Sequence, residues 1–102
     1  MKLKDSLGMG SLGIGNKIAN KKIKLLILKA EKGDAKSQHE IAFYYLTGQN
    51  LKQDYSKALK WWKLSSSKDY GKAHYNLGCL YLNGIGVSIN YKKSFYYFNL
   101  SI

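Results

Sequence analysis

The 102-residue sequence has no proline and no arginine, a single cysteine, and six acidic residues against 17 lysines. One cysteine excludes an internal disulfide, and with only two histidines beside it the chain cannot build a structural zinc site. The absence of proline favours helices, because proline removes a backbone donor and clashes in a helix interior. The length allows one small domain, and 45% apolar residues are enough for the chain to fold.

Two stretches invite comparison with export or membrane signals, and neither fits. The N-terminal stretch up to Lys17 has lysines followed by small residues, but Asp5 interrupts it and it lacks a leucine-rich core. The 19 residues Ala73–Tyr91 carry no charge, yet they contain three asparagines and three glycines, which make a poor membrane span. We therefore expect no transmembrane segment and a soluble, cytoplasmic protein, with a secreted effector as the alternative.

The N-terminal third is predicted to contain one helix after a glycine-rich start. Residues 1–16 hold four glycines, and we expect them to form a flexible segment. A first helix is predicted within residues 17–34, over Ile18–Lys32, with Asn16 as its N-cap and Gly33 at its end. Its apolar stripe recurs at helical spacing and comprises Ala19, Ile23, Leu26 and Ala30.

Four further helices follow, separated by glycines and by residues that cap helices. They are predicted over about 35–47, between Asp54 and Asp69, over about 72–83, and from Asn90 to the end of the sequence. Asp54 and Asn90 are the expected N-caps, because their side-chain oxygens can accept hydrogen bonds from the unpaired amides of a first turn.

An internal repeat of 36 residues is the most informative feature. Shifted by that distance, Ala35–Ser66 lies over Gly71–Ile102 without a gap, with 8 identities in 32 positions. Asn50 then faces Gly86, and both residue types tolerate the left-handed backbone that a helix exit requires. The same shift places Leu28 on Leu64, so the first helix corresponds to the second half of an earlier unit or to a cap.

The repeat predicts two units, residues 35–70 and residues 71–102, of which the second is incomplete at its C-terminus. Each unit is a pair of antiparallel helices, which cannot bury its apolar face alone and must stack on a neighbour. Ala42 and the equivalent Gly78 are expected where two helices approach closely. Bulky aromatic residues, among them Trp62, are expected to fill the space between layers.

These residues resemble a known family. The second unit carries the linked pattern Leu77-Gly78-x-x-Tyr81-Leu82-x-Gly84-x-Gly86-Val87, followed by Asn90-Tyr91-x-Lys93-Ser94. The first unit carries Tyr45-Leu46-x-Gly48 and then Gln53-Asp54-Tyr55-x-Lys57-Ala58-x-x-Trp61. Both resemble the Sel-one-like repeat (SLR) family of tetratricopeptide-like helical repeats. The resemblance implies an all-α fold, a right-handed α-α superhelix (solenoid) of about two and a half repeats. Ser65 and Ser94 depart from the family pattern, which prefers alanine at both positions.

The same resemblance implies a function. SLR proteins are non-enzymatic scaffolds that bind a partner through the concave surface lined by the first helix of each unit. Phe43 and Tyr75 are the natural anchors, because aromatic residues dominate binding energy in most interfaces. Lysines on this surface would suit an acidic or extended peptide. The expected concave positions are Lys36, His39, Glu40, Phe43, Thr47, Lys72, Tyr75, Asn76, Cys79 and Asn83.

Catalysis, cofactors and metals are not expected. Gly8–Gly13 matches the dinucleotide-binding pattern G-x-G-x-x-G, but that pattern works only between a strand and a helix. No acidic residue is spaced to orient His39 or His74, so we expect no Ser/His/Asp set. We expect Cys79 to be a thiol on a helix face or in the core, because a nucleophile would need an electropositive partner and a lowered pKa.

Two other classes of function stay open at this point. Seventeen lysines could bind nucleic acid or another anionic surface, but arginine, which phosphate and base recognition favours, is absent and the lysines are spread along the chain. A solvated lysine-rich surface is the preferred interpretation. The chain could also be an effector fragment or a truncated paralogue, and Phe95, Phe98 and Ile102 form an apolar edge through which it could self-associate.

Overall fold

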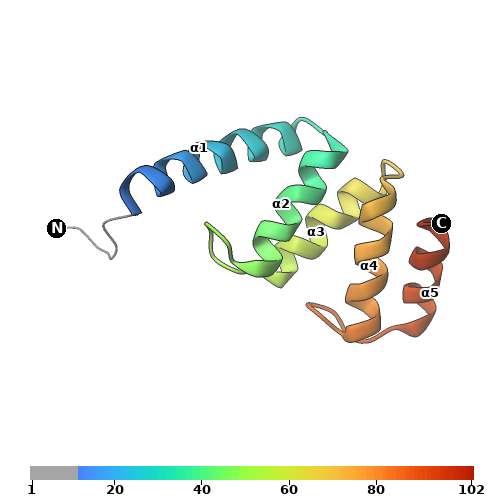
Figure 1. Cartoon of the computed structure of the whole chain (residues 1–102). Helices are drawn as coiled ribbons and strands as arrows, with labels where there is room; N and C mark the ends of the chain where they lie inside the picture. The colour runs from blue at the N-terminus through green and yellow to red at the C-terminus, as the bar shows by residue number, and fades with distance from the viewer. Residues whose placement is uncertain (1–11) are drawn as a thin grey trace.

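The computed structural model describes the backbone of residues 12–102 and the side chains of residues 20–102. Its five helices are α1 (Leu12–Glu31), α2 (Ala35–Thr47), α3 (Tyr55–Ser66), α4 (Gly71–Asn83) and α5 (Tyr91–Leu100). The part of the chain it describes contains no strand. Each helix packs against the next one along the chain, and the molecule measures 51 × 27 × 18 Å along its principal axes (Figure 1). This is the all-α arrangement of helix pairs that the 36-residue repeat predicts.

The first helix is longer than its sequence predicts. It begins at Leu12 and not near residue 17, so residues 12–16 are helical and Asn16 lies inside α1 instead of capping it. A glycine in a helix interior costs only about 1 kcal/mol, so Gly13 and Gly15 do not end the helix. Residues 1–11, with most of the predicted flexible segment and of the glycine pattern beginning at Gly8, lie outside the described residues.

Side-chain caps set where three of the helices begin. Asp54 accepts a hydrogen bond from the Lys57 amide at 3.1 Å, and Asn90 accepts one from the Lys93 amide at 2.9 Å, as predicted. Asp34 caps α2 by accepting from the backbone amide of Ser37 at 3.0 Å. Hydrogen bonds from the Ser37 hydroxyl and amide lower the pKa of the Asp34 carboxyl.

The loops that join the helices of each pair have the same geometry in both units. Asn50 and Gly86 occupy equivalent places with φ of 63° and 72°, which confirms the left-handed backbone predicted from their alignment. Gly86 also has little space, because a Cβ there would lie 2.9 Å from the Cβ of Tyr55. The second loop therefore packs directly on the start of α3.

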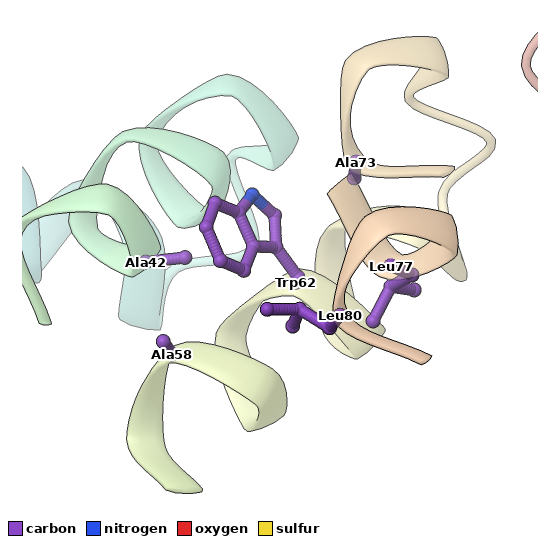
Figure 2. Close-up of a cluster of buried hydrophobic side chains, with 6 residues drawn as sticks. All are labelled: Ala42, Ala58, Trp62, Ala73, Leu77 and Leu80. Atoms are coloured by element: carbon purple, nitrogen blue, oxygen red, sulfur yellow. The ribbon is translucent and has the colours of Figure 1, made fainter. Parts of the chain in front are cut away.

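The larger of two core clusters lies where the two units meet, and the smaller one joins α1 to α2. Trp62 has no exposed surface, and it packs among the small and branched side chains of α2, α3 and α4 shown in Figure 2, namely Ala42, Ala58, Ala73, Leu77 and Leu80. Within the second unit, a Cβ on Gly78 would lie 2.5 Å from the ring of Phe98. The small residues at these positions thus allow the close helix approach that the sequence predicts.

The two serines that replace alanine hydrogen-bond to the first helix of their own unit. Ser65 Oγ donates to the Ala35 carbonyl and Ser94 Oγ donates to the Gly78 carbonyl, both at 2.8 Å. Both serines are almost fully buried. Each hydroxyl therefore has a partner, which is what a buried polar group requires.

Candidate interaction surfaces

An open groove of about 710 Å³ lies between α2 and α4, the first helices of the two units. Phe43 and Tyr75 are the large exposed hydrophobic residues in its lining, and they are 40% and 56% exposed. Rings this exposed on a folded surface are available to a partner. The lining consists of His39, Phe43, Gly71, Lys72, Tyr75, Asn76 and Ser101.

His39 is buried, although it borders the groove. Only 7% of its surface is exposed, and its Nδ1 accepts a hydrogen bond of 2.9 Å from the Trp62 indole Nε1. Its ring also meets the edge of the Phe43 ring at a centroid distance of 5.0 Å. Burial lowers the pKa of His39, and the nearby Lys72 ammonium lowers it further. His39 therefore provides the acceptor that the buried indole N–H group needs. It supports the groove from beneath and is not a freely exposed contact.

The other predicted concave residues are divided between separate places. Thr47 and Glu40 line a smaller hollow of about 350 Å³ between α1 and α2, which Phe43 also borders. Lys36 lies in a further hollow beside α1. Asn83 turns back on its own helix, donating to the Cys79 carbonyl at 3.0 Å. Neither of these last two residues lines the groove.

Cys79 does not line the groove, but Tyr75 beside it does. Its side chain is half-buried beside Tyr75, one turn earlier on α4. The neighbouring Cys79 side chain raises the pKa of the Tyr75 hydroxyl further above the physiological range, and the hydroxyl is neutral there. Tyr75 can thus offer a partner both a ring face and a neutral hydroxyl.

Two residues that line the groove, Gly71 and Ser101, were not predicted from the sequence. Gly71 is the first residue of α4, and a Cβ placed there would meet no other atom within 4 Å. Ser101 is the C-cap of α5, the second helix of its unit, and so it does not come from a first helix. Only the return of α5 along α4 brings Ser101 to the groove, and no local pattern signals that.

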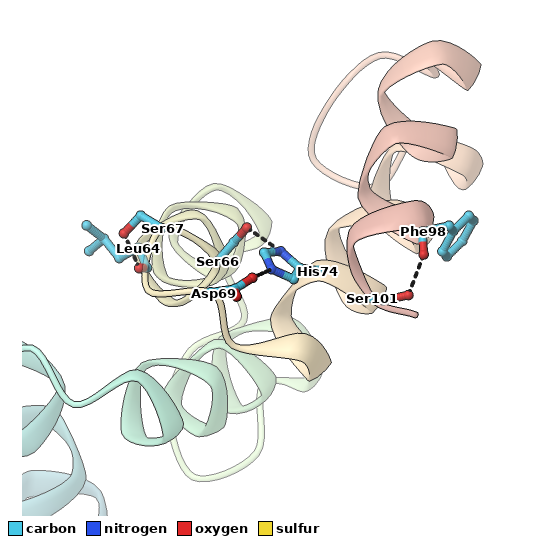
Figure 3. A network of polar contacts seen from close by, with 7 residues as sticks. All are labelled: Leu64, Ser66, Ser67, Asp69, His74, Phe98 and Ser101. Atoms are coloured by element: carbon cyan, nitrogen blue, oxygen red, sulfur yellow. Dashed lines mark hydrogen bonds and ion pairs between the residues drawn. The ribbon is translucent and has the colours of Figure 1, made fainter.

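A Ser/His/Asp constellation is present at the turn between α3 and α4, contrary to the sequence expectation. His74 Nδ1 lies 2.8 Å from Ser66 Oγ, and His74 Nε2 lies 2.8 Å from Asp69 Oδ1 (Figure 3). The expectation was wrong because Asp69 adopts a φ of 60°, which turns its carboxylate toward a histidine five residues later. His74 itself is only 2% exposed.

The surroundings of this constellation indicate a structural tie. A serine hydrolase needs a substrate cleft and oxyanion donors beside the serine, and none of the hollows described above is lined by Ser66, His74 or Asp69. The preceding unit has an equivalent tie without any such chemistry. There Gln38, 36 residues before His74, donates to the Ala30 carbonyl at the end of α1 at 3.0 Å. Both residues thus anchor a first helix to the helix before it.

Among residues 12–102, no three histidine, cysteine or acidic side chains gather in a way that could hold a metal ion. The same part of the chain has no helix that is long and apolar enough to cross a membrane.

Stacked antiparallel helix pairs with a groove along their first helices define an α-solenoid of helical repeats. Residues 35–70 and residues 71–102 each match the family model described as Sel1 repeat. The chain therefore belongs to the Sel1-repeat family, as its linked motifs indicate.

Solved structures with this fold include proteins from two bacteria. A protective antigen of uropathogenic Escherichia coli strains, described as displaying an SLR fold, is 32% identical over 78% of this chain, with a TM-score of 0.76. A Sel1 repeat protein from Oxalobacter formigenes is 26% identical over 78% of this chain, with a TM-score of 0.74. The chain matches only 17% and 32% of the lengths of these two proteins. No curated protein matches the chain.

Proposed function

We propose that this chain is a non-enzymatic protein-interaction module that binds an extended peptide segment in the groove between α2 and α4. The observation that carries the proposal is the exposure of Phe43 and Tyr75 on the same open groove. Both rings are held by the fold, since Phe43 packs edge-on against Trp62 and Tyr75 lies 5.6 Å from the ring of Phe98. Anchors that are already positioned lose little conformational entropy on binding.

The charges around the groove favour an acidic partner. Lys72 lines the groove itself, and Lys36 occupies the equivalent place one unit earlier. Glu40 is the single acidic residue on α2, and α4 has none. Electrostatic complementarity of this kind speeds association and selects partners more than it adds affinity. We therefore expect the bound segment to contain aspartate or glutamate beside an apolar side chain.

The test is peptide selection followed by affinity measurement. A displayed library rich in aspartate and glutamate is selected on the full chain, and the affinity of the enriched peptides is measured by calorimetry. Phe43→Ala/Tyr75→Ala is expected to weaken binding at least tenfold, because central aromatic anchors carry about 2 kcal/mol or more. The matched control is Tyr91→Ala/Phe95→Ala, which removes one tyrosine and one phenylalanine that are exposed on α5.

Tyr75→Ala alone guards against loss of folding in the double variant, because Phe43 also supports His39 and Trp62. A loss of affinity in Tyr75→Ala and not in the control supports the proposal. Equal affinity of wild type and Phe43→Ala/Tyr75→Ala for every selected peptide contradicts it, as does a library that yields no binding peptide.

A second surface supports self-association. Leu59 on α3 is half-buried, whereas the equivalent Phe95 on α5 is 69% exposed, and Ile102, just after the end of α5, is fully exposed. Phe98, which we expected at the same edge, is half-buried against Gly78 between α4 and α5. The edge therefore consists of Phe95 and Ile102, and a second copy of the chain could cover it as α4 covers α3.

Sedimentation velocity over a range of concentrations tests this association. We expect a concentration-dependent dimer that Phe95→Ser/Ile102→Ser converts to a monomer. A wild-type chain that stays monomeric at the highest concentration contradicts it.

A further inference from the structure

Lysines that are spread along the sequence are concentrated on one set of helices. Ten of the 17 lysines lie on α1, α3 and α5, the second helices of successive pairs, whereas α2 and α4 carry one each. The only acidic residue on α1, α3 and α5 is Glu31. We call α1, α3 and α5 the outer helices, because the groove between α2 and α4 lies on the other set.

Equivalent residues recur on the outer helices at intervals of 36 residues. Leu28, Leu64 and Leu100 form one such set, and they are 54%, 38% and 41% exposed. Exposed lysines form the neighbouring sets, which are Lys21, Lys57 and Lys93, and Lys24 and Lys60. Because the units share one fold, each set occupies equivalent places on successive units. The outer helices thus repeat a half-exposed leucine flanked by lysines.

Two contacts give this surface a defined form. The ammonium groups of Lys57 and Lys93 lie 5.4 and 5.3 Å from the ring centres of Tyr45 and Tyr81, an equivalent cation–π pair in each unit. On α3 a hollow of about 420 Å³ is lined by two leucines, two lysines and a serine, namely Leu59, Leu64, Lys60, Lys63 and Ser56. Apolar side chains and positive charges therefore share this surface.

We propose that the outer helices dock on an anionic lipid bilayer, lying on its surface. Lysines attract acidic headgroups, and single leucines between them enter the boundary between headgroups and acyl chains. Nucleic acid accounts less well for the surface, since leucines gain nothing from a phosphate backbone and arginine is absent. The proposal is independent of the groove, which lies on α2 and α4.

The experiment is co-sedimentation of the full chain with vesicles. Vesicles of phosphatidylcholine alone are compared with vesicles that also contain phosphatidylglycerol, at low and at physiological salt. Lys24→Gln/Lys60→Gln removes two charges from the outer helices. The matched control Lys36→Gln/Lys72→Gln removes two charges, also 36 residues apart, from α2 and α4. Leu28→Ser/Leu64→Ser/Leu100→Ser tests the leucines, and thermal melting of each variant checks that it is folded.

We expect binding to the vesicles that contain phosphatidylglycerol and none to phosphatidylcholine. Lys24→Gln/Lys60→Gln should weaken that binding about 30-fold and the control pair far less. The reason is that a lysine contributes to binding only when it lies close to the membrane surface. No binding to anionic vesicles at low salt overturns the proposal, and so does an equal loss in both lysine pairs, which would indicate net charge alone. Binding of duplex DNA in place of vesicles, unaffected by the leucine substitutions, also overturns it and favours nucleic acid.

Discussion

At the scale of single residues, the buried pair of His39 and Trp62 joins the two helices of the first unit. The indole donates to His39 Nδ1 at 2.9 Å, so that nitrogen has to stay unprotonated in the folded state. The resemblance to SLR proteins led us to expect His39 on the concave face, but it did not identify a partner for the side chain. The hydrogen bond spans 23 residues, a distance at which no local pattern predicts a contact.

This pair makes the stability of the chain depend on pH. Because the pKa of His39 is lowered from its usual 6.5, the folded state binds fewer protons than the unfolded state between the two values. The stabilising contribution is fully present above pH 6.5 and is lost as the pH falls through the folded pKa. Asp34 makes a separate contribution at lower pH. Hydrogen bonds from Ser37 lower its pKa below the usual 3.8, so its stabilising contribution is present above pH 3.8 and is lost as the pH falls through the folded pKa.

The comparison that isolates His39 is His39→Asn, whose side-chain oxygen can still accept from Trp62 but does not titrate. Urea unfolding followed by tryptophan fluorescence at about pH 5 and about pH 8 measures both proteins. We expect wild type to lose more stability than His39→Asn on acidification, even if the variant is less stable overall. Identical losses would contradict the assigned role of His39.

Gly78 provides a second residue-scale prediction, with a control on the same helix. A Cβ on Gly78 would overlap the Phe98 ring, so Gly78→Ala should lower the free energy of unfolding by about 1–2 kcal/mol despite the better helix propensity of alanine. Gly71→Ala, where a Cβ has open space, should be neutral or slightly stabilising. Denaturant unfolding measures the free energy of unfolding of both variants. A destabilised Gly71→Ala with an unaffected Gly78→Ala would contradict the close packing assigned to Gly78.

At the scale of the helices, most of the architecture could be predicted because its signals are local. Asp54 and Asn90 cap their helices as their side chains suggest, and Asn50 takes the left-handed backbone as its alignment with Gly86 indicates. The start of α1 could not be predicted, because helix extension through Gly13 depends on a small cost per residue and not on a stop signal.

The junctions between units depend on contacts that the sequence did not reveal. Gln38 and His74 occupy equivalent places and each binds the end of the preceding helix. We expect His74→Ala to lower the free energy of unfolding by about 2 kcal/mol, since it leaves a cavity and breaks two hydrogen bonds. His74→Gln should cost less, because glutamine already serves that place in the first unit. Urea unfolding measures both, and equal losses would show that the hydrogen bonds do not matter.

At the scale of the whole molecule, folding separates two kinds of surface that are mixed along the chain. The aromatic groove lies on α2 and α4, and most lysines lie on α1, α3 and α5. The lysines look evenly spread along the sequence because the lysine-rich helices α1, α3 and α5 alternate with α2 and α4, which carry one lysine each. The groove was predictable in part, through Phe43, Lys72 and Tyr75, since they lie on first helices. Ser101 was not, since it arrives from α5.

The most direct test of the central claim is a map of amide chemical shifts. The ¹⁵N-labelled full chain is titrated with an acidic peptide selected on it, and shifts are compared with those of Phe43→Ala/Tyr75→Ala. We expect the perturbed amides to cluster on α2 and α4 around Phe43, Lys72 and Tyr75, and to disappear in the double variant. Perturbations that fall instead on α3 and α5, or that persist unchanged in the double variant, would contradict a groove that binds partners.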